Sequence, residues 1–338
     1  MTWGNQRKDP NWPKDEFGRG EVAAQLWIFW GWVAVGLIAI GLSGAFWIWK
    51  TVSERKHEVV AYCAQDQVYA EPIFREFERE TGWRVRAVYD SEAVKTVGLA
   101  NRLLAERSHP QCDVFWGNEE MRTRQLVAQD VFLTNGWATF GYRTRRIVIN
   151  TNHVSVASAP RSLLELTNQT WHAKVALAYP QFGTTGTHFH ALRQHWGDPG
   201  WENWCRDLSA GKPVLVDGNS VVVATVGRGD AWVGLTDSDD IAAGQREGLP
   251  IAPLPINGET LLIPNTAAIT KSAPHPEAAR QLFEYLQRAE VIGRLVEWKA
   301  LEGVDAGSIS VSALQVNWDS LLGELADSTA KLNKIFLR

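Results

Sequence analysis

The sequence predicts an α/β protein with two lobes, preceded by one N-terminal transmembrane helix. Three observations lead to this prediction: an uncharged run near the N-terminus, an alternation of short apolar strands with amphipathic helices after it, and a restart of that alternation midway along the chain. Such alternation is typical of a mostly parallel sheet with helices on both faces. Roughly 280 residues follow the uncharged run, which is enough for two linked lobes.

The uncharged run covers residues 23–49 and contains no Asp, Glu, Lys or Arg. It is longer than the roughly 20 apolar residues that a helix needs to cross a bilayer. Trp27 and Trp49 lie near its two ends, where indole rings favour the headgroup region. A removable signal peptide is the alternative, because the small residues at 43–45 would form a cleavage site. The run exceeds the usual apolar region of about 7–15 residues, so we expect an uncleaved signal anchor.

The balance of positive charge across this run predicts its orientation. Four Lys or Arg residues precede the run and three follow it before residue 57, a slight excess on the N-terminal side. Positive residues favour the cytoplasmic side of a membrane. We therefore expect residues 1–22 to form a cytoplasmic tail and residues 50–57 a linker. The rest of the chain would then work at the periplasmic or extracellular face, anchored in the cytoplasmic (inner) membrane.

The first strand–helix alternation occupies residues 58–150. A buried strand at 59–63 is followed by a helix at 72–81, whose apolar residues Ile73 and Phe77 share one face. The other elements expected here are strands at 84–89, 113–116 and 146–150 and helices at 93–107 and 120–129.

The same alternation restarts after residue 150. Strands are expected at 174–178, 214–216, 231–235, 261–263 and 267–270, and helices at 187–196, 221–227, 239–247 and 276–287. Two lobes of similar plan, linked near residues 150 and 263, fit this order best. We expect residues 58–150 together with 264–338 to form lobe 1, and residues 151–263 to form lobe 2.

Composition and motifs exclude several classes of function. The net charge of −4 gives no basic surface of the kind that binds nucleic acid. Cys63, Cys112 and Cys205 are odd in number and imply no disulfide framework, so buried free thiols are expected. The sequence contains no Walker A motif and no catalytic motif. We therefore expect a protein that is not an enzyme, has no resident cofactor, and takes any energy it needs from partner proteins.

A histidine cluster near the middle of the chain resembles a metal site only at first sight. His188 and His190 would lie about 200° apart on a helix of 3.6 residues per turn, so they cannot share one ion there. We expect surface histidines at these positions and at His195 rather than a zinc site.

Short polar residues follow six of the predicted strands, directly before a helix in most cases. They occupy residues 64–67, 90–92, 117–120, 179–187, 217–220 and 236–240. In open α/β sheets, ligands bind outside the carboxyl ends of the strands. These stretches therefore supply candidate ligand-binding residues: Asp66, Asn118, Glu119, Asn219, Ser220, Asp237 and Asp239. The alternative for each of them is a helix N-cap, which is the usual role of a short polar side chain at that position.

The stretch 182–187 is a more specific candidate, because it combines two glycines and three threonines at a predicted helix start. Glycine lets the backbone approach a ligand, threonine hydroxyls donate hydrogen bonds, and a helix N-terminus attracts anions. We interpret Thr184, Thr185, Gly186 and Thr187 as a seat for phosphate, carbonate or carboxylate. A turn with a helix cap is the alternative.

Several of these stretches, taken in order, resemble the periplasmic solute-binding proteins of ABC importers, and among them the ferric-iron-binding class. The resemblance runs over residues 59–298 and is carried by residues 61–66, 77–82, 112–119, 143–150, 229–237, 263–267 and 274–279. It implies a type II periplasmic-binding-protein-like fold that closes over its ligand by a hinge motion. It also implies delivery of the ligand to a separate permease and ATPase, and we expect a monomer.

The resemblance further implies where a metal would bind. The ligand from the first loop falls near Asp66, the acidic ligand after the third strand near Glu119, and the anion seat of the class on Thr185, Gly186 and Thr187. The class commonly has adjacent tyrosines after the strand expected at 231–235, where this chain has Thr236 to Asp240 instead. The implied metal ligands are therefore carboxylates: Asp66, Glu119, Asp237 and Asp239.

Three interpretations of this carboxylate pocket stay open. Carboxylates suit a hard cation such as iron or another metal, bound together with a synergistic anion. Acids that face an anion seat also suit an organic zwitterion, such as a phosphonate that carries an amine, or another small organic solute. Finally, the acids only cap helices and bind their ligand through water. A ligand-sensing ectodomain that signals through a partner protein is the alternative to an importer component.

Overall fold

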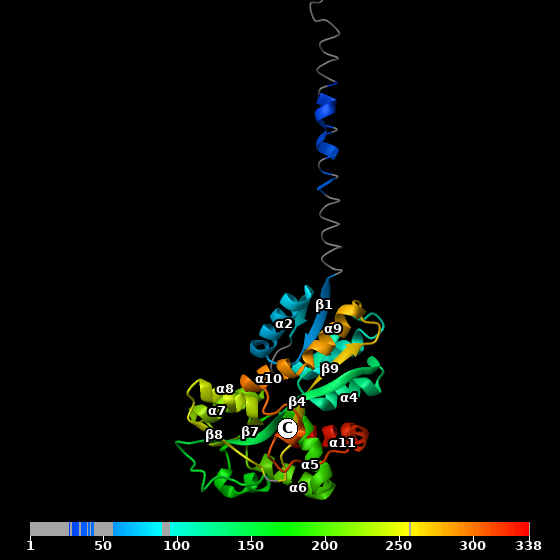
Figure 1. Ribbon diagram of the computed structural model, residues 1–338. Helices are drawn as coiled ribbons and strands as arrows, with labels where there is room; N and C mark the ends of the chain where they lie inside the picture. The colour runs from blue at the N-terminus through cyan, green and yellow to red at the C-terminus, as the bar shows by residue number, and fades with distance from the viewer. Residues whose placement is uncertain are drawn as a thin grey trace, which may run out of the picture. The chain divides into compact units, whose positions relative to one another are not determined.

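The computed structural model describes residues 27, 29–33, 35–38, 40, 42–43, 57–89, 95–256 and 258–337 (Figure 1). By its internal contacts the chain divides into two units, Met1–Lys56 and His57–Arg338. In the described part of the first unit the backbone is helical. No helix among the described residues is both long enough and apolar enough to cross a membrane. The tail at 1–22, part of the expected span at 23–49 and most of the linker lie outside the described residues, so the tail, the span and the linker stay predictions.

The second unit consists of two structural halves. The first half, which is built from two separate stretches of the chain, contains a mixed sheet. Its strands run in the order β2-β1-β3-β9-β4, with β1 parallel to β2 and β3, and with β9 antiparallel to β3 and β4. The bounds are β1 Glu58–Cys63, β2 Arg84–Val88, β3 Val114–Gly117, β4 Phe132–Asn150 and β9 Leu262–Thr270. The helices are α2 Gln67–Thr81, α3 Lys95–Ala105, α4 Glu120–Ala128, α9 Pro276–Leu286 and α10 Ala289–Glu297. Apolar side chains are buried on both faces of this sheet, in two separate clusters.

The second half continues the sheet in the order β4-β7-β5-β6, with β8 paired to β4. Its strands are β5 Val175–Ala178, β6 Val214–Val216, β7 Val233–Asp237 and β8 Ile251–Leu254, and its helices are α5 Gly183–Trp196, α6 Asp198–Ala210, α7 Asn219–Arg228 and α8 Ser238–Arg246. Short 3-10 turns lie at Leu164–Thr167, Gln169–Trp171 and Ala306–Ser308. The expected alternation of strands and helices is therefore confirmed.

Strand β4 is the element that joins the two halves. Its residues 132–144 pair with β9, and its residues 145–150 pair with β7 and β8. The pairing shifts register between Phe140 and Tyr142, where Gly141 has φ +55° and its α-carbon faces Leu301. A β-carbon at Gly141 would meet Leu301 Cδ1 at 2.3 Å, so only glycine fits this bend. A strand was predicted only at 146–150, so residues 132–145 of β4, where the strand joins the two halves, were not predicted.

The C-terminal helix α11 (Trp318–Phe336) packs into the core of the second half. Leu321, Leu325 and Leu332 belong to the same buried cluster as Phe189 of α5 and Trp204 of α6. The expected division placed residues 264–338 in lobe 1, whereas this helix packs with elements of lobe 2. Its amphipathic pattern is visible in the sequence, but the pattern does not say which apolar surface the helix covers.

The three cysteines are buried, and so are two of the three histidines of the cluster at residues 188–195. Cys63, Cys112 and Cys205 are buried thiols outside any disulfide of the described residues. His188 and His190 on α5 are 0% and 3% exposed, so the expectation that they lie on the surface was wrong. The helix begins at Gly183, four residues earlier than predicted, and its apolar surroundings include α6 and α11. His195, near its end, is exposed.

Candidate functional site

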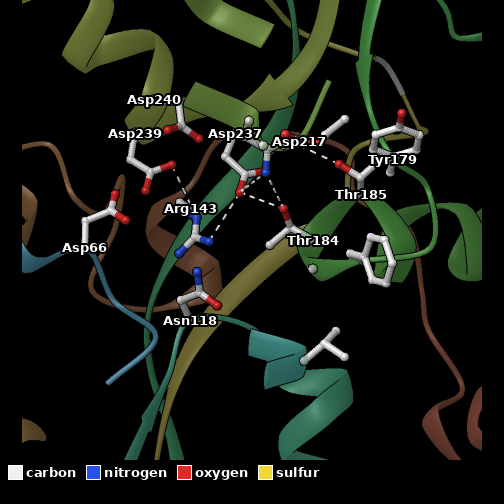
Figure 2. A pocket seen from close by; sticks show the side chains of 16 residues that line it. Asp66, Asn118, Arg143, Tyr179, Thr184, Thr185, Asp217, Asp237, Asp239 and Asp240 are labelled. Atoms are coloured by element: carbon white, nitrogen blue, oxygen red, sulfur yellow. Dashed lines mark hydrogen bonds and ion pairs between the residues drawn. The ribbon is translucent and has the colours of Figure 1, made fainter. Parts of the chain in front are cut away.

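A small cavity lies at the carboxyl ends of the strands, between the two halves of the second unit (Figure 2). It is lined by Asp66, Val97, Asn118, Arg143, Ala178, Tyr179, Phe182, Gly183, Thr184, Thr185, Asp217, Gly218, Asn219, Asp237, Asp239 and Asp240. Its volume of about 60 Å³ gives room for roughly four to six water molecules. The cavity is where the rule for open α/β sheets places a ligand.

The cavity brings together seven of the eleven residues that the sequence analysis selected. These are Asp66, Asn118, Thr184, Thr185, Asn219, Asp237 and Asp239. Figure 2 shows Asp66, Asp239 and Asp240 on one side, Tyr179 and Thr185 on the other, and Arg143 with Asp237 between them. The remaining four predicted residues, Glu119, Gly186, Thr187 and Ser220, do not line it.

Glu119 has a structural task away from the cavity. Its fully buried carboxylate accepts hydrogen bonds from the backbone N–H groups of Met121 at 2.7 Å and Arg122 at 3.0 Å, and so caps α4. It also accepts a hydrogen bond of 3.0 Å from the Thr187 hydroxyl on α5. Burial raises the pKa of Glu119 even though these donors and Arg122 oppose the shift. Glu119 and Thr187 thus connect α4 to α5 rather than binding a metal in the cavity.

Gly186 and Ser220 are also explained without a ligand. Gly186 lies in the first turn of α5, where an added β-carbon would approach the Gln181 carbonyl carbon to 3.2 Å. A larger residue would push this turn apart, so the glycine serves close backbone packing. Ser220 is exposed on α7.

Two buried arginines on β4 were missed by the sequence analysis. The side chains of Arg143 and Arg145 are 2% and 0% exposed. Arg143 lies 3.3 Å from Asp237 Oδ2 through Nη2, and its Nε lies 3.3 Å from Asp239 Oδ1. Arg145 donates to Asp237 Oδ1 at 2.6 Å and to Asn219 Oδ1 at 2.9 Å. Arg143 and Arg145 are two positions apart and therefore lie on the same face of a strand. This spacing was the only signal in the sequence by which the pair could have been identified.

Asp237 at the end of β7 is the centre of this network. Its Oδ1 accepts from Arg145, and its Oδ2 accepts from Arg143, from Thr184 Oγ1 at 2.8 Å and from Asn219 Nδ2 at 3.3 Å. Burial alone would raise the pKa of Asp237, but Arg145 and Arg143 outweigh it and the pKa is lowered. The same contacts act on Arg143: burial would lower its pKa, and Asp239 and Asp237 raise it. Asp237 is therefore ionised and holds both arginines in place.

In the second half, three helices begin at the cavity without a side-chain cap. The cap positions of α5, α7 and α8 are Phe182, Gly218 and Asp237, and none of these side chains accepts a hydrogen bond from its own helix. Gly183 adopts φ +53° at the first position of α5 and lines the cavity. Each uncapped helix start carries a partial charge of roughly +0.5 and unsatisfied N–H donors. The interpretation of the polar strand ends as mere helix caps is thus not supported at these three helices.

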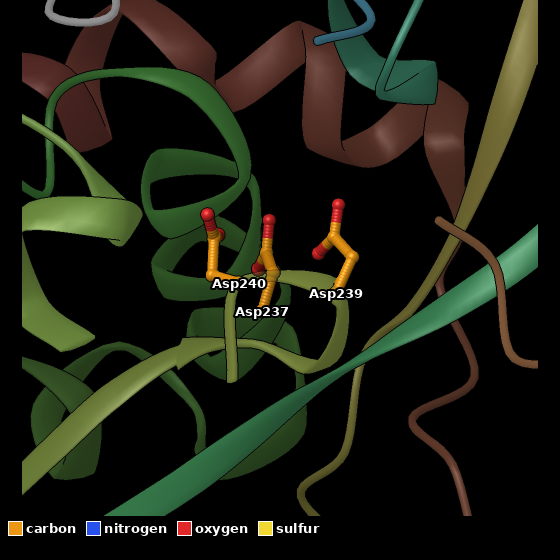
Figure 3. A group of neighbouring side chains, drawn as sticks. All are labelled: Asp237, Asp239 and Asp240. Carbon is orange, nitrogen blue, oxygen red and sulfur yellow. The ribbon is translucent and has the colours of Figure 1, made fainter. Parts of the chain in front are cut away.

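The acidic residues gather around the start of α8. Ligand oxygens of Asp237, Asp239 and Asp240 all lie within 4.8 Å of one another, and Figure 3 shows the three side chains side by side. Asp239 and Asp240 belong to the first turn of α8, where the helix dipole favours negative charge. Among the residues described, this is the only group of three or more His, Cys, Asp or Glu with metal-site spacing.

The buried histidines do not contribute to this group. His188 Nε2 lies 2.7 Å from the Glu259 carbonyl oxygen, and His190 Nδ1 lies 2.8 Å from Ser328 Oγ. Burial lowers the pKa of each to about 3, so both are neutral at pH 7. They stabilise the packing of α5 and do not form a zinc site.

A comparison with protein families agrees with this fold. A family model of bacterial extracellular solute-binding proteins matches residues 59–298, and the chain belongs to this family. Proteins of this class work with an ABC permease and an ATPase. No curated protein matches the chain at a significant level.

Solved structures with the same fold include iron-binding proteins and one sugar phosphate complex. Iron-bound HitA from Pseudomonas aeruginosa has a TM-score of 0.74 at 17% identity, over 82% of this chain and 99% of that chain. The Trichodesmium IdiA (FutA) complex with iron and citrate has a TM-score of 0.65 at 18% identity, over 83% and 100%. AfuA from Actinobacillus pleuropneumoniae with bound fructose-6-phosphate has a TM-score of 0.72 at 16% identity, over 83% and 98%. The resemblance to the ferric-iron-binding class is thus confirmed at the level of the fold.

Proposed function

We propose that this protein is the solute receptor of an ABC importer and captures a small solute with a positively charged group. The charge of the cavity lining supports the proposal, because five aspartates and one arginine line it. The uncapped N-termini of α5, α7 and α8 each carry a positive partial charge of roughly half an elementary charge, which offsets part of the negative charge. The remaining negative potential favours a solute with a cationic group.

The transport role follows from family membership and from the sequence. The chain contains no Walker A motif, so the energy for transport comes from the partner ATPase, and the permease receives the solute. The uncharged run at 23–49 would anchor the receptor, which we expect to be a monomer, on the outer face of the cytoplasmic membrane beside its permease. Ligand-dependent uptake in vesicles that contain the permease and ATPase tests this role. A response that passes instead to a partner kinase would identify a sensor.

A metal ion with a companion anion is one candidate solute. It is favoured by the three neighbouring carboxylates at the start of α8, since hard cations prefer oxygen ligands. The uncapped start of α5, with Thr184 and Thr185, would then bind the anion. An organic solute that carries an ammonium group satisfies the same charge requirement.

The proposed function is tested by a thermal-shift screen of the full chain in detergent. The screen compares cationic, neutral and purely anionic solutes, because a ligand at 100 times its Kd adds about 2.7 kcal/mol to the free energy of unfolding. We expect shifts only with solutes that carry a positive charge, and expect Asp66→Asn to weaken them. Asp207→Asn, an exposed carboxylate on α6, is the matched control and should behave like the wild type. Shifts confined to neutral or anionic solutes would refute the proposal.

A further inference from the structure

The hydrogen bonds of Asp237 limit what kind of cation the cavity can hold. A carboxylate offers about four lone-pair sites, and Asp237 already accepts from four donors: Arg143, Arg145, Thr184 and Asn219. Three of these donors share Oδ2 and Arg145 alone donates to Oδ1, so at most one acceptor site, on Oδ1, is left for a metal ion. Asp237 can therefore contribute little to a metal site formed by the three carboxylates within 4.8 Å of one another.

The position of Arg143 restricts the cation further. Its guanidinium lies 3.3 Å from both Asp237 and Asp239 and is 2% exposed, so its charge is fixed beside the acidic group. This charge offsets part of the attraction that the carboxylates exert on any cation, and both effects scale with the charge of the cation, so the number of available ligand oxygens decides between a metal ion and an ammonium group. A hard metal ion also requires six or more oxygen ligands as a rule. An ammonium group requires three acceptors, and three carboxylates line this side of the cavity: Asp66, Asp239 and Asp240.

The opposite side of the cavity is built for an anionic group. The uncapped start of α5 brings Gly183, Thr184 and Thr185 to the lining. Arg143 lies between the two sides, with its Nε ion-paired to Asp239 on the acidic side and its Nη2 ion-paired to Asp237. An oxyanion at this position would accept hydrogen bonds from backbone N–H groups and from this guanidinium.

The lining of the cavity also includes apolar side chains. Val97, Ala178, Phe182 and the ring of Tyr179 belong to the lining. A hydrated metal–anion pair has no apolar surface to bury against these side chains. A short carbon chain between two charged groups gains binding free energy when these side chains bury it. The volume of about 60 Å³ restricts that chain to a few atoms.

We propose that the solute is a small organic zwitterion whose ammonium group binds Asp66, Asp239 and Asp240 and whose oxyanion binds the start of α5. This inference rests on the proposed function and names the substrate class of the same site. The chemistry of the site is shared by carboxylate, sulfonate and phosphonate zwitterions. The experiment below distinguishes these three oxyanions.

The test uses the full chain in detergent with three probes that share an ammonium group and a two-carbon linker: β-alanine, taurine and 2-aminoethylphosphonate. Ethylamine and propionate supply each charge alone, and manganese chloride and ferric citrate represent metals. We expect at least one zwitterion to raise the Tm, and expect its affinity by titration calorimetry to exceed that of either single-charge probe at least about tenfold.

Three variants locate the two ends of the solute. Asp239→Asn and, in the other half of the unit, Asp66→Asn should each reduce affinity for the zwitterion at least about tenfold, and Thr185→Val should reduce it while sparing binding of ethylamine. Asp207→Asn should leave both unchanged, and circular dichroism confirms that each variant is folded. If Asp239→Asn does not fold, Asp66→Asn carries the test.

The outcomes separate this inference from the proposed function. A shift with metals and none with any zwitterion overturns the inference but keeps the proposed receptor for a cationic solute. The absence of a shift with all three zwitterions also overturns the inference. A shift with propionate or a neutral solute alone overturns both. A zwitterion that binds equally well to Asp66→Asn, Asp239→Asn and the wild type contradicts the assigned ammonium site.

Discussion

At the scale of single residues, the two buried arginines determine what Asp237 does. Both guanidinium groups are at most 2% exposed, and Asp237 is ion-paired with each of them. Breaking a buried ion pair by removing one partner leaves an uncompensated charge, which is more costly than the loss of a surface pair. Asp237 is therefore a structural residue first, and substitutions there affect folding as well as the ligand.

Replacing Asp237 by Asn should destabilise the fold strongly. The amide would remove the negative charge and turn an N–H donor toward one guanidinium, so we expect the free energy of unfolding to fall by about 3–5 kcal/mol. Urea unfolding followed by circular dichroism measures the change. Asp217→Asn alters an exposed carboxylate at the same cavity and should stay within about 0.5 kcal/mol of the wild type. Equal stability of the Asp237 variant and the wild type would contradict the role given to the network.

The same residues show how far the sequence can predict a site. Polar residues at strand ends identified Asp66, Asn118, Asn219, Asp237 and Asp239, because the position of a strand end follows from local patterns. Arg143 and Arg145 could not be found in the same way, since their partner Asp237 is more than 90 residues away along the chain. The charge of a buried group becomes interpretable only when its partners are known.

At the scale of elements, helix α5 begins at the cavity and carries two buried histidines, His188 and His190. The pKa of both His188 and His190 is lowered to about 3 by burial, against an ordinary value of 6.5 in the unfolded chain. Between these two values the unfolded state binds more protons than the folded state. The free energy of unfolding should therefore decrease as the pH falls below about 6.5, and the loss should continue toward pH 3.

Replacing His190 by Asn removes one of these titrations and keeps a polar partner for Ser328. Each histidine contributes a slope of up to about 1.4 kcal/mol per pH unit. We expect the variant to lose less stability than the wild type between about pH 6 and pH 4, measured by urea unfolding at each pH. His195→Asn, at an exposed position near the end of the same helix, is the control and should follow the wild-type curve. Parallel curves for His190→Asn and the wild type would show that the histidine titrates normally.

Helix α11 contacts both halves of the second unit. Its leucines pack with α5 and α6, while Trp318 at its first position lies against Arg124 of α4, 5.3 Å from the ring centroid to the guanidinium carbon. Arg124 is also 5.1 Å from the ring of Trp137 on β4, so it is held between two indoles. The helix therefore links α4 to the core around α5 and α6.

Replacing Trp318 by Ala should weaken this link without touching the cavity. We expect a loss of about 0.5–1 kcal/mol from the cation–π contact, plus a contribution from reduced packing. Spin labels at Val68 on α2 and Val221 on α7, both exposed, should report a broader distance distribution in the variant. The native cysteines are buried and would not be labelled. Trp318→Phe retains an aromatic face and should resemble the wild type, and identical distributions in all three proteins would exclude a role of this contact in fixing the distance between the two halves.

At the scale of the whole molecule, the second unit consists of two halves that share β4 and meet in contacts beside the cavity. Glu119 accepts from Thr187, and Arg246 of α8 donates to Tyr69 Oη at 2.5 Å and to the Trp298 carbonyl oxygen at 3.2 Å. The alternation of strands and helices predicted both halves, because each depends on local patterns. The crossing within β4 and the packing of α11 depend on distant partners, and local patterns did not predict them.

The most direct test of the account is native mass spectrometry of the full chain purified from the producing bacterium in detergent. The account predicts an added mass from one small solute with a positively charged group. That mass should be absent from Asp66→Asn and present in the Asp207→Asn control. A bound solute without any positive charge, or one retained equally by Asp66→Asn, would contradict the claim that the carboxylates of this cavity select the cargo.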